Sequence, residues 1–398
     1  MRVLFTSTPG WGHIHPMVPL AKAFQARGDE VAWAVPQEAA ARVEQVGFQT
    51  FRAGLGAAAA FAEIQKASPA IATIRRAGAE FVSFEALEAV RTKTFPKMFG
   101  GARVRVALSE LLPVVEEWRP DFLIHDQGEF AGPIAAAAAG IPNACHAFGH
   151  GISPAAVDAG ELGITDLWES VGLAPPPFAG AYTYAYLDIY PESLRSADLS
   201  YLPFVQPARP VPFATGEPST LPDWIASDRT PLVYVTFGTV FNDNPDVIRT
   251  VVEGVRTLPV RVLVTVGPHA DPAVLGAQPP NVYVERYVPQ TQLLPHCAAV
   301  VSHAGSGTFL ASLAEGLPQV CIPQGADQFA NAEACIRGGV GRTLVPGEVS
   351  IESVHAATEE VLSDKSFRRA AEGVQAEIAA MPDPAAVAEV LATMFATR

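Results

Sequence analysis

Short apolar runs rich in β-branched residues alternate with helical stretches along this 398-residue chain, and this alternation constrains the fold more than any other feature. The first run, VLFTST at 3–8, is followed by apolar residues at helical spacing that end near Gly28. The runs VAWAV at 31–35 and FLIHD at 122–126 have the same character. Uniformly apolar strands joined by helical crossovers are typical of parallel sheets covered on both faces. We therefore predict an α/β fold with parallel sheets.

A proline-rich stretch divides the chain into two units of similar size. The segment LPFVQPARPVPFATGEPSTLP has no clean period and is typical of a semi-rigid linker. Beyond it come five further strand-like runs, LVYVTFG, VRVLVTVG, NVYVERYV, AVVSHAG and VCIPQG. With 49% hydrophobic residues, a chain of this length can fill two cores. We predict a first domain at 1–205, a linker at 206–230, a second domain at 231–380 and a helical tail at 381–398 that packs back on the first domain.

Charge and hydropathy exclude several classes of partner. The net charge is −14 and no basic block stands against it, so we expect no nucleic-acid partner. No apolar run reaches the roughly 18 residues of a membrane span, and the apolar run at the N-terminus is too short for a signal peptide. The cysteines lack CxxC spacing, which favours reduced thiols in the cytoplasm. They are Cys145, Cys297, Cys321 and Cys335.

Two glycine-rich turns follow predicted strands, PGWGH at 9–13 and HAGSGTFL at 303–310. Free N–H groups and the helix dipole attract anions where a strand hands over to a helix. Neither turn completes G-x-G-x-x-G and no GxxxxGK[ST] is present, which argues against a nicotinamide dehydrogenase and a P-loop nucleotidase. In the second turn the glycines allow a diphosphate to approach the backbone, while Ser306 and Thr308 can donate hydroxyls. Ser306 as a simple helix N-cap is the structural alternative.

Three further polar strand ends accompany the second turn: FGT at 237–239, YVPQ at 287–290 and PQGADQFANA at 323–332. Ligands of open α/β sheets bind outside the carboxyl ends of the strands, so these segments should converge on one crevice. The ring of Tyr287 suits a nucleobase, and Asp327 with Gln328 suits sugar hydroxyls. A nucleotide carrying a sugar would use all four segments.

The order GxGHxxP, FGT, [W/Y]VPQ, HxGxGT, PxxxDQ resembles the family-1 nucleotide-sugar glycosyltransferases of GT-B fold, in particular bacterial enzymes that glycosylate antibiotics. The resemblance covers essentially the whole chain. It implies two Rossmann-like domains facing a cleft, with a TDP- or UDP-sugar on the second domain and a hydrophobic aglycone on the first. The chain departs from the family at Tyr287, often Trp, and at Ser302, often a second His. The expected donor-binding residues are Gly12, Thr239, Tyr287, Val288, Gln290, His303, Gly305, Ser306, Gly307, Thr308, Asp327 and Gln328.

His13 is the predicted general base. Transfer of a sugar to a hydroxyl requires removal of the hydroxyl proton, and free histidine titrates at about 6.5. His13 lies on the first turn, and Asp126 ends a strand of the same domain, where it can fix the imidazole tautomer and stabilise the imidazolium. The resemblance assigns the same two roles to these positions. A base-activated single displacement predicts inversion at the anomeric carbon. The structural alternative is a helix cap at His13 and a turn residue at Asp126.

The acceptor site is expected in segments without a clean period, about 54–101 and 147–190, which suit the walls of a substrate pocket. His146 and His150 are expected to line this pocket rather than to bind a metal. The chain has no Asp-x-Asp pair for a divalent metal, and we expect no metal or cofactor. The expected acceptor residues are Trp11, Phe61, Phe84, His146, Phe148 and His150. Two other readings stay open: another nucleotide-sugar enzyme of GT-B fold, such as an epimerase or hydrolase, and a non-catalytic nucleotide-sugar-binding partner.

Overall fold

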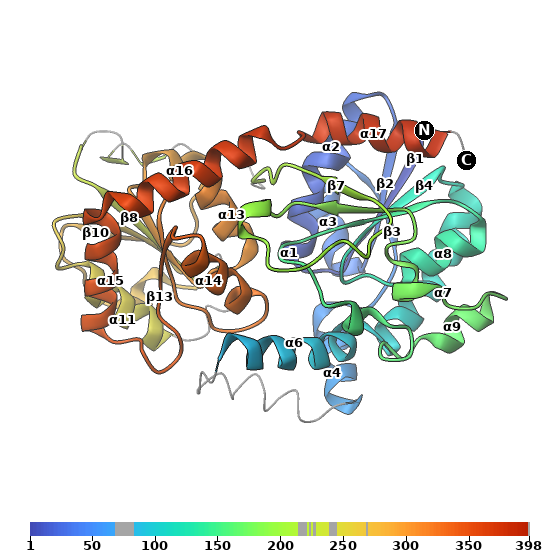
Figure 1. The fold of residues 1–398 in the computed structure, drawn as a ribbon, viewed down its shortest axis with the longest axis horizontal. Helices are drawn as coiled ribbons and strands as arrows, with labels where there is room; N and C mark the ends of the chain where they lie inside the picture. Colours follow the sequence, from blue (N-terminus) through green and yellow to red (C-terminus); the bar gives the residue numbers. More distant parts are fainter. Residues whose placement is uncertain are drawn as a thin grey trace.

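The structure is a computed structural model that describes residues 1–67, 83–213, 221–222, 224–225, 228–238, 245–267 and 270–396. Two domains lie side by side, each with a parallel sheet between layers of helices (Figure 1). The predicted α/β class with parallel sheets is confirmed.

The first sheet has seven strands in the order β3-β2-β1-β4-β5-β6-β7, all parallel. Its central strands β1 and β4 are buried almost throughout, as their uniformly apolar sequences require. The strand order reverses between β1 and β4, which creates a crevice at their carboxyl ends. The strands are β1 Arg2–Thr6, β2 Glu30–Val35, β3 Gln49–Arg52, β4 Phe122–Asp126, β5 Asn143–His146, β6 Ala185–Asp188 and β7 Val205–Pro207.

Helices α1 to α9 belong to the first domain. Gly140, in the left-handed conformation at φ 69°, ends the alanine-rich α8. Ser83 caps the start of α6 by accepting a hydrogen bond from the backbone of Ala86. The described helices are α1 Trp11–Ile14, α2 Val18–Ala26, α3 Gln37–Gln45, α4 Ala57–Ala67, α6 Phe84–Phe99, α7 Ala102–Trp118, α8 Ala131–Ala139 and α9 Thr165–Ser170.

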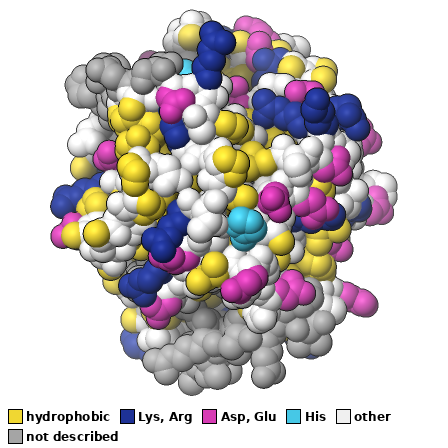
Figure 2. Space-filling view, turned by 90° about the vertical axis from the view of Figure 1, so that its left-hand side faces the viewer, with side chains coloured by type: hydrophobic (Ala, Val, Ile, Leu, Met, Phe, Trp, Pro, Cys, Tyr) yellow, Lys and Arg dark blue, Asp and Glu magenta, His cyan; other side chains and the backbone are white. Residues whose placement is uncertain are grey.

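The second sheet has six parallel strands in the order β10-β9-β8-β11-β12-β13. The five strand-like runs of this half all form strands, and β13 adds a short sixth. The strands are β8 Leu232–Thr236, β9 Arg261–Thr265, β10 Val282–Glu285, β11 Ala299–Ser302, β12 Gln319–Cys321 and β13 Gly341–Thr343. The helices are α11 Pro245–Val255, α12 Gln290–Leu293, α13 Ser306–Ala314, α14 Gln328–Arg337, α15 Ile351–Ser363, α16 Lys365–Ala380 and α17 Pro384–Ala396. On the outer face of this domain, basic and acidic side chains are intermixed (Figure 2).

The proline-rich stretch and the C-terminal helices both connect the two domains. The predicted boundary between residues 205 and 206 falls inside β7, which pairs with β6 at the edge of the first sheet. The strand contains Pro207, and an edge strand tolerates the missing backbone N–H of a proline. At the other end, α16 runs from the second domain towards the first, and α17 lies over α2 (Figure 1). The Phe395 ring of α17 lies 5.0 Å from the ring of Phe122.

No single helix in the described part of the chain is long and apolar enough to cross a membrane. Helices α16 and α17, bent by 40° where they meet, reach the required length and composition only as a pair.

The two domains share part of one core. Phe309 and Leu313 of α13 and Ala332 of α14 belong to the same buried cluster as β1 and β4. Tyr190, which follows β6, stacks on Phe309 with ring centroids 6.5 Å apart, and its hydroxyl donates to Asn331 Oδ1 at 2.9 Å. The segment after β6 therefore packs the first domain against α13 and α14, the helices that follow two of the predicted ligand-binding turns of the second domain.

Candidate active site

His13 and Asp126 meet at the crevice between β1 and β4. His13 lies in α1, the short helix that begins after Gly10 in the turn following β1. Its Nδ1 lies 3.0 Å from Asp126 Oδ1, at the last residue of β4. The Asp126 side chain is fully buried, whereas 19% of the His13 side chain is exposed. Because Nδ1 faces the carboxylate, Nε2 is the ring nitrogen left for a substrate.

The surroundings of Asp126 keep it ionised. Burial alone would raise its pKa, but the nearby His13 and the backbone N–H groups of Thr8 and Gly128 hold the pKa below its usual value. These N–H groups donate to Asp126 Oδ2 at 2.7 Å and Oδ1 at 2.6 Å respectively. The carboxylate is therefore fixed in place and negative at neutral pH.

Two phenylalanines flank the His13 ring. The ring of Phe148 lies 4.5 Å away and that of Phe99, at the end of α6, lies 5.5 Å away. Phe148 was expected near an acceptor and does lie beside the histidine. The other expected acceptor residue of this turn, Trp11, packs instead on His15 at 4.5 Å, with the guanidinium of Arg42 over its ring.

Of the remaining histidines of this domain, His125, His146 and His150 are buried and His15 is partly buried. Burial lowers the pKa of His15, His146 and His150 to about 4, so each ring is neutral at pH 7. His146 contacts the carbonyl of Ala147, and His150 contacts Ser196 Oγ at 2.7 Å. Within the described ranges no group of three or more His, Cys, Asp or Glu side chains could hold a metal ion.

The backbone at His15 differs from what the sequence predicts. Because Pro16 follows His15, extended backbone is favoured at that position. His15 is nevertheless helical, at φ −55° and ψ −43°, since α1 runs directly into a 3₁₀ turn that carries the proline.

The second glycine-rich turn begins α13 of the second domain. Gly305 is the N-cap residue and no side chain caps this end, so the N-cap role considered for Ser306 was wrong. The Ser306 hydroxyl instead donates to Asp327 Oδ2 at 2.5 Å. Asn331 Nδ2 donates to Ser306 Oγ at 3.0 Å and to the Ala304 carbonyl at 2.8 Å. Two predicted donor segments, HAGSGT and PQGADQ, are therefore joined by hydrogen bonds.

His303 fills the space beneath this turn. A Cβ added to Gly238 would lie 2.8 Å from the ring of His303, and one added to Gly305 would lie 2.5 Å from it. The two glycines are thus needed to admit the imidazole. Burial lowers the pKa of His303 to about 4, which leaves the ring neutral.

The remaining donor candidates lie around the same turn. Gln290 donates to Thr308 Oγ1 at 3.1 Å and so ties the loop after β10 to α13. In that loop Tyr287 is half exposed and Val288 is buried. The amide oxygen of Gln328 accepts from the backbone of Gln324 and Gly325, which shapes the loop before α14. Thr239 lies outside the described residues.

Gly12 and Gly307 each occupy the first turn of a helix next to open space. A Cβ added to either would meet nothing within 4 Å. Both residues are exposed. The protein itself therefore does not require glycine at these positions, and the open space is available to a ligand that approaches the helix start.

Comparisons with known proteins identify the family of this chain. Models of the N-terminal and C-terminal domains of the erythromycin biosynthesis protein CIII-like family match residues 22–238 and 249–394. The L-demethylnoviosyl transferase of Streptomyces niveus is 32% identical, over 98% of this chain and 98% of the relative. The elloramycin glycosyltransferase ElmGT of Streptomyces olivaceus is 33% identical, over 99% and 98%. The chain belongs to the erythromycin biosynthesis protein CIII-like family.

A solved structure supports the same assignment. The spinosyn rhamnosyltransferase SpnG, complexed with thymidine diphosphate, matches with a TM-score of 0.76 and 27% identity over 98% of this chain and 100% of that one. SpnG has also been solved in complex with the spinosyn aglycone. The protein is a glycosyltransferase of GT-B fold, and the resemblance drawn from its motifs is confirmed.

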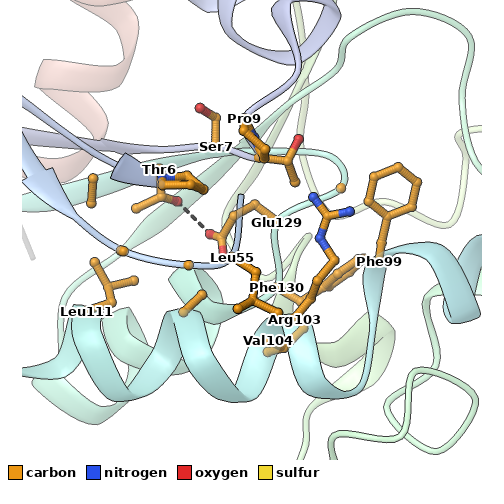
Figure 3. Close-up of a pocket in the computed structure, with 17 residues that line it drawn as sticks. Thr6, Ser7, Pro9, Leu55, Phe99, Arg103, Val104, Leu111, Glu129 and Phe130 are labelled. Carbon is orange, nitrogen blue, oxygen red and sulfur yellow. Dashed lines mark hydrogen bonds between the residues drawn. The ribbon is translucent and has the colours of Figure 1, made fainter. Parts of the chain in front are cut away.

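The glycosyltransferase has a cavity of about 30 Å³ beside the dyad, at the carboxyl ends of β1 and β4 (Figure 3). Glu129 lines it, and the carboxylate of Glu129 accepts from Thr6 Oγ1 at 2.6 Å and from the backbone at the start of α8. Burial raises the pKa of Glu129 to about 7. The guanidinium of Arg103, on α7, points towards the turn at Pro9 that follows β1 (Figure 3).

Several residues of this region were not among the predicted site residues. Phe99, Arg103, Asn331 and Tyr190 carry no local pattern that marks them, because their roles depend on packing between distant elements. Glu129 had a signal: an acidic residue just before the alanine-rich stretch indicates a helix start. Of the expected acceptor residues on helices, Phe61 lies on α4 and Phe84 begins α6, both partly buried.

Proposed function

We propose that this glycosyltransferase moves a sugar, in the first place a deoxysugar, from a TDP- or UDP-sugar to a hydroxyl of a hydrophobic natural-product aglycone. The reaction inverts the anomeric carbon and needs no metal. His13 is the general base and Asp126 its positioning partner. The observation that carries the proposal is the 3.0 Å contact between His13 Nδ1 and a fully buried Asp126 carboxylate at the carboxyl ends of the strands.

The acceptor step follows from the dyad. Asp126 holds Nδ1–H, so the neutral ring presents Nε2 to the acceptor hydroxyl. As the acceptor oxygen attacks the anomeric carbon, its proton passes to Nε2, and the bond from that carbon to the diphosphate oxygen breaks. The electron pair of that bond leaves with the diphosphate. The carboxylate then faces an imidazolium, which it stabilises at short range.

The donor step is assigned to the second domain. Thr239, Ser306 and Thr308 would offer hydroxyls, and Gly305 and Gly307 backbone N–H groups, to the leaving diphosphate at the start of α13. Tyr287 and Val288 would hold the base, and Asp327 and Gln328 the sugar. Support comes from SpnG, 27% identical, which has been solved in complex with thymidine diphosphate. Two relatives are named as an L-demethylnoviosyl transferase and an elloramycin glycosyltransferase.

We also propose that the reaction takes place in the cytoplasm. Its support is that the four cysteines are free and buried, as expected of a protein from a reducing compartment.

A donor-by-acceptor screen read by mass spectrometry tests the function. TDP- and UDP-sugars are incubated with aromatic and macrolide aglycones, and without any aglycone. The proposal predicts a glycoside only when an aglycone is present, with an anomeric configuration opposite to that of the donor by NMR. Turnover without an aglycone would indicate an epimerase or hydrolase, and binding without turnover would indicate a non-catalytic partner. Retention of configuration would exclude His13 as the base in a single displacement.

A further inference from the structure

The cavity beside the dyad has a defined place in the fold. It lies where the order of the first sheet reverses, between the ends of β1 and β4, and the residues Thr8 and Phe99 line it. The same two residues touch the dyad, since Thr8 N–H donates to Asp126 and Phe99 packs on His13. At about 30 Å³ it exceeds the roughly 10–15 Å³ that one water requires, but it is far too small for an aglycone. A single substituent of a bound molecule fits.

Two hydrogen-bond donors of the cavity are available. Arg103 is partly buried. Its Nη1 donates to the Met98 carbonyl at 3.2 Å, and its guanidinium lies 5.5 Å from the Phe99 ring centroid. A guanidinium carries five N–H donors. Among the described residues Arg103 forms no ion pair within 4 Å, and the carboxylates of Asp126, Glu129 and Glu38 act on it only at longer range. The hydroxyl of Thr8 is buried and has no hydrogen-bond partner among the described residues.

The acceptors that face the cavity are already in use. Both oxygens of Glu129 accept hydrogen bonds, from Thr6 Oγ1 and from the backbone of Ala131 and Gly132. Ser7 Oγ accepts from the indole of Trp33 at 3.0 Å. The cavity therefore offers unused donors and few unused acceptors, and it favours a ligand atom that accepts hydrogen bonds.

The partial burial of Arg103 also favours a hydrogen-bond acceptor in the cavity. Removal from water lowers the pKa of Arg103, although the charges of Asp126 and Glu129 act in the opposite direction. A partly buried cation without a close partner is costly, and an oxygen that accepts two of its hydrogen bonds offsets that cost. The site thus gains most from a polar oxygen that enters with the substrate.

We infer that this cavity is a specificity subsite for the acceptor, in which Arg103 and Thr8 bind a carbonyl oxygen adjacent to the hydroxyl that receives the sugar. The inference rests on the proposed function, because it places the reacting hydroxyl at His13. It selects acceptors in which a hydroxyl and a ketone or quinone oxygen share one edge of a ring system. Arg103 would act on acceptor choice and orientation, and not on proton transfer.

A matched pair of phenols tests the inference. 8-Hydroxy-1-tetralone carries a carbonyl next to its hydroxyl, and 5,6,7,8-tetrahydro-1-naphthol has a methylene in the same place. The dissociation constant of each is measured by titration calorimetry on the full chain with saturating TDP. Hydrogen bonds to a charged group predict that the ketone binds about 10- to 100-fold tighter. Arg103→Met should abolish this ratio, and Arg103→Lys should restore part of it.

Arg105→Met is the matched control, because Arg105 lies on the same helix but pairs at the surface with Asp166 at 2.7 Å. It should keep the wild-type ratio. Equal affinity for the two phenols, a ratio unchanged in Arg103→Met, or binding of neither phenol would overturn the inference. His13→Ala separates it from the proposed function: that variant should lose transfer yet keep the binding ratio. If the ratio depends on Arg103 but the screen detects no transfer, the subsite stands and the proposed function fails.

Discussion

Replacement of Asp126 by asparagine removes one charge and almost no volume from the dyad. In the proposed transition state His13 becomes an imidazolium about 4 Å, charge to charge, from the carboxylate. At the effective dielectric constant of about 20 that suits such sites, this attraction is worth about 4 kcal/mol. That energy corresponds to about a thousandfold loss of kcat. The asparagine NH₂ adds to the loss, because it must face His13 Nδ1 or one of the N–H groups of Thr8 and Gly128.

The assay is initial-rate kinetics with a substrate pair from the screen, together with thermal unfolding and TDP affinity. Asp126→Asn should lower kcat about a thousandfold and leave TDP affinity within about twofold, because Asp126 lies in the first domain. Asp188→Asn is the control, since Asp188 is an equally buried carboxylate at the end of β6 that pairs with Arg195 at 3.2 Å. It should keep kcat within a few fold of the wild type. A folded Asp126→Asn enzyme within tenfold of wild-type kcat would refute the reasoning.

Three further predictions follow from other parts of the site. Glu129 has a pKa of about 7 when folded and 4.5 as a free side chain, so its contribution to stability is present below pH 4.5 and lost as pH rises to 7. We expect the free energy of unfolding of the wild type, measured by urea titration relative to Glu129→Gln, to fall by up to about 3 kcal/mol between pH 4.5 and 8. A difference between the two proteins that stays constant with pH would contradict this prediction. In Gly149→Ala, the new Cβ would lie 2.0 Å from Ser306 Oγ and 2.6 Å from Ser306 Cβ, so Gly149 and the start of α13 must shift apart, and kcat/KM should fall about tenfold or more. Gly373→Ala, whose Cβ meets nothing within 4 Å, should leave kcat/KM unchanged, and equal rates in both variants would show that the Gly149 contact does not matter. Finally, EDTA should leave the initial rate unchanged; a rate lost with EDTA and restored by Mg²⁺ would contradict metal independence.

The fold was predictable where strands are buried and apolar on both faces. VLFTST, FLIHD and the five runs of the second half all form strands. Strands with polar or very short sequences were missed, among them QTFR of β3, NACH of β5 and GRT of β13. These segments are extended because neighbouring strands offer backbone partners, and that pairing has no pattern within four residues of sequence.

The site was predictable where a residue type is tied to a strand end. His13 follows β1 and Asp126 ends β4, and these two strands are neighbours in the sheet. Residues at the carboxyl ends of neighbouring parallel strands are expected to meet in the crevice there. The use of each side chain was harder to foresee. Serine is a residue type typical of helix N-caps, but the Ser306 hydroxyl donates to the Asp327 carboxylate and Gly305 is the N-cap residue. Arg103 enters the site from α7, through packing that links residues far apart in the chain.

The measurement that tests the account most directly is the steady-state kinetics of His13→Ala with TDP affinity measured in parallel. If His13 removes the acceptor proton, kcat should fall by roughly 10²–10⁴, while TDP binds as tightly as to the wild type. His15→Ala, two residues along the same turn and not in contact with Asp126, should keep kcat within a few fold. Wild-type turnover in a correctly folded His13→Ala enzyme would contradict the account.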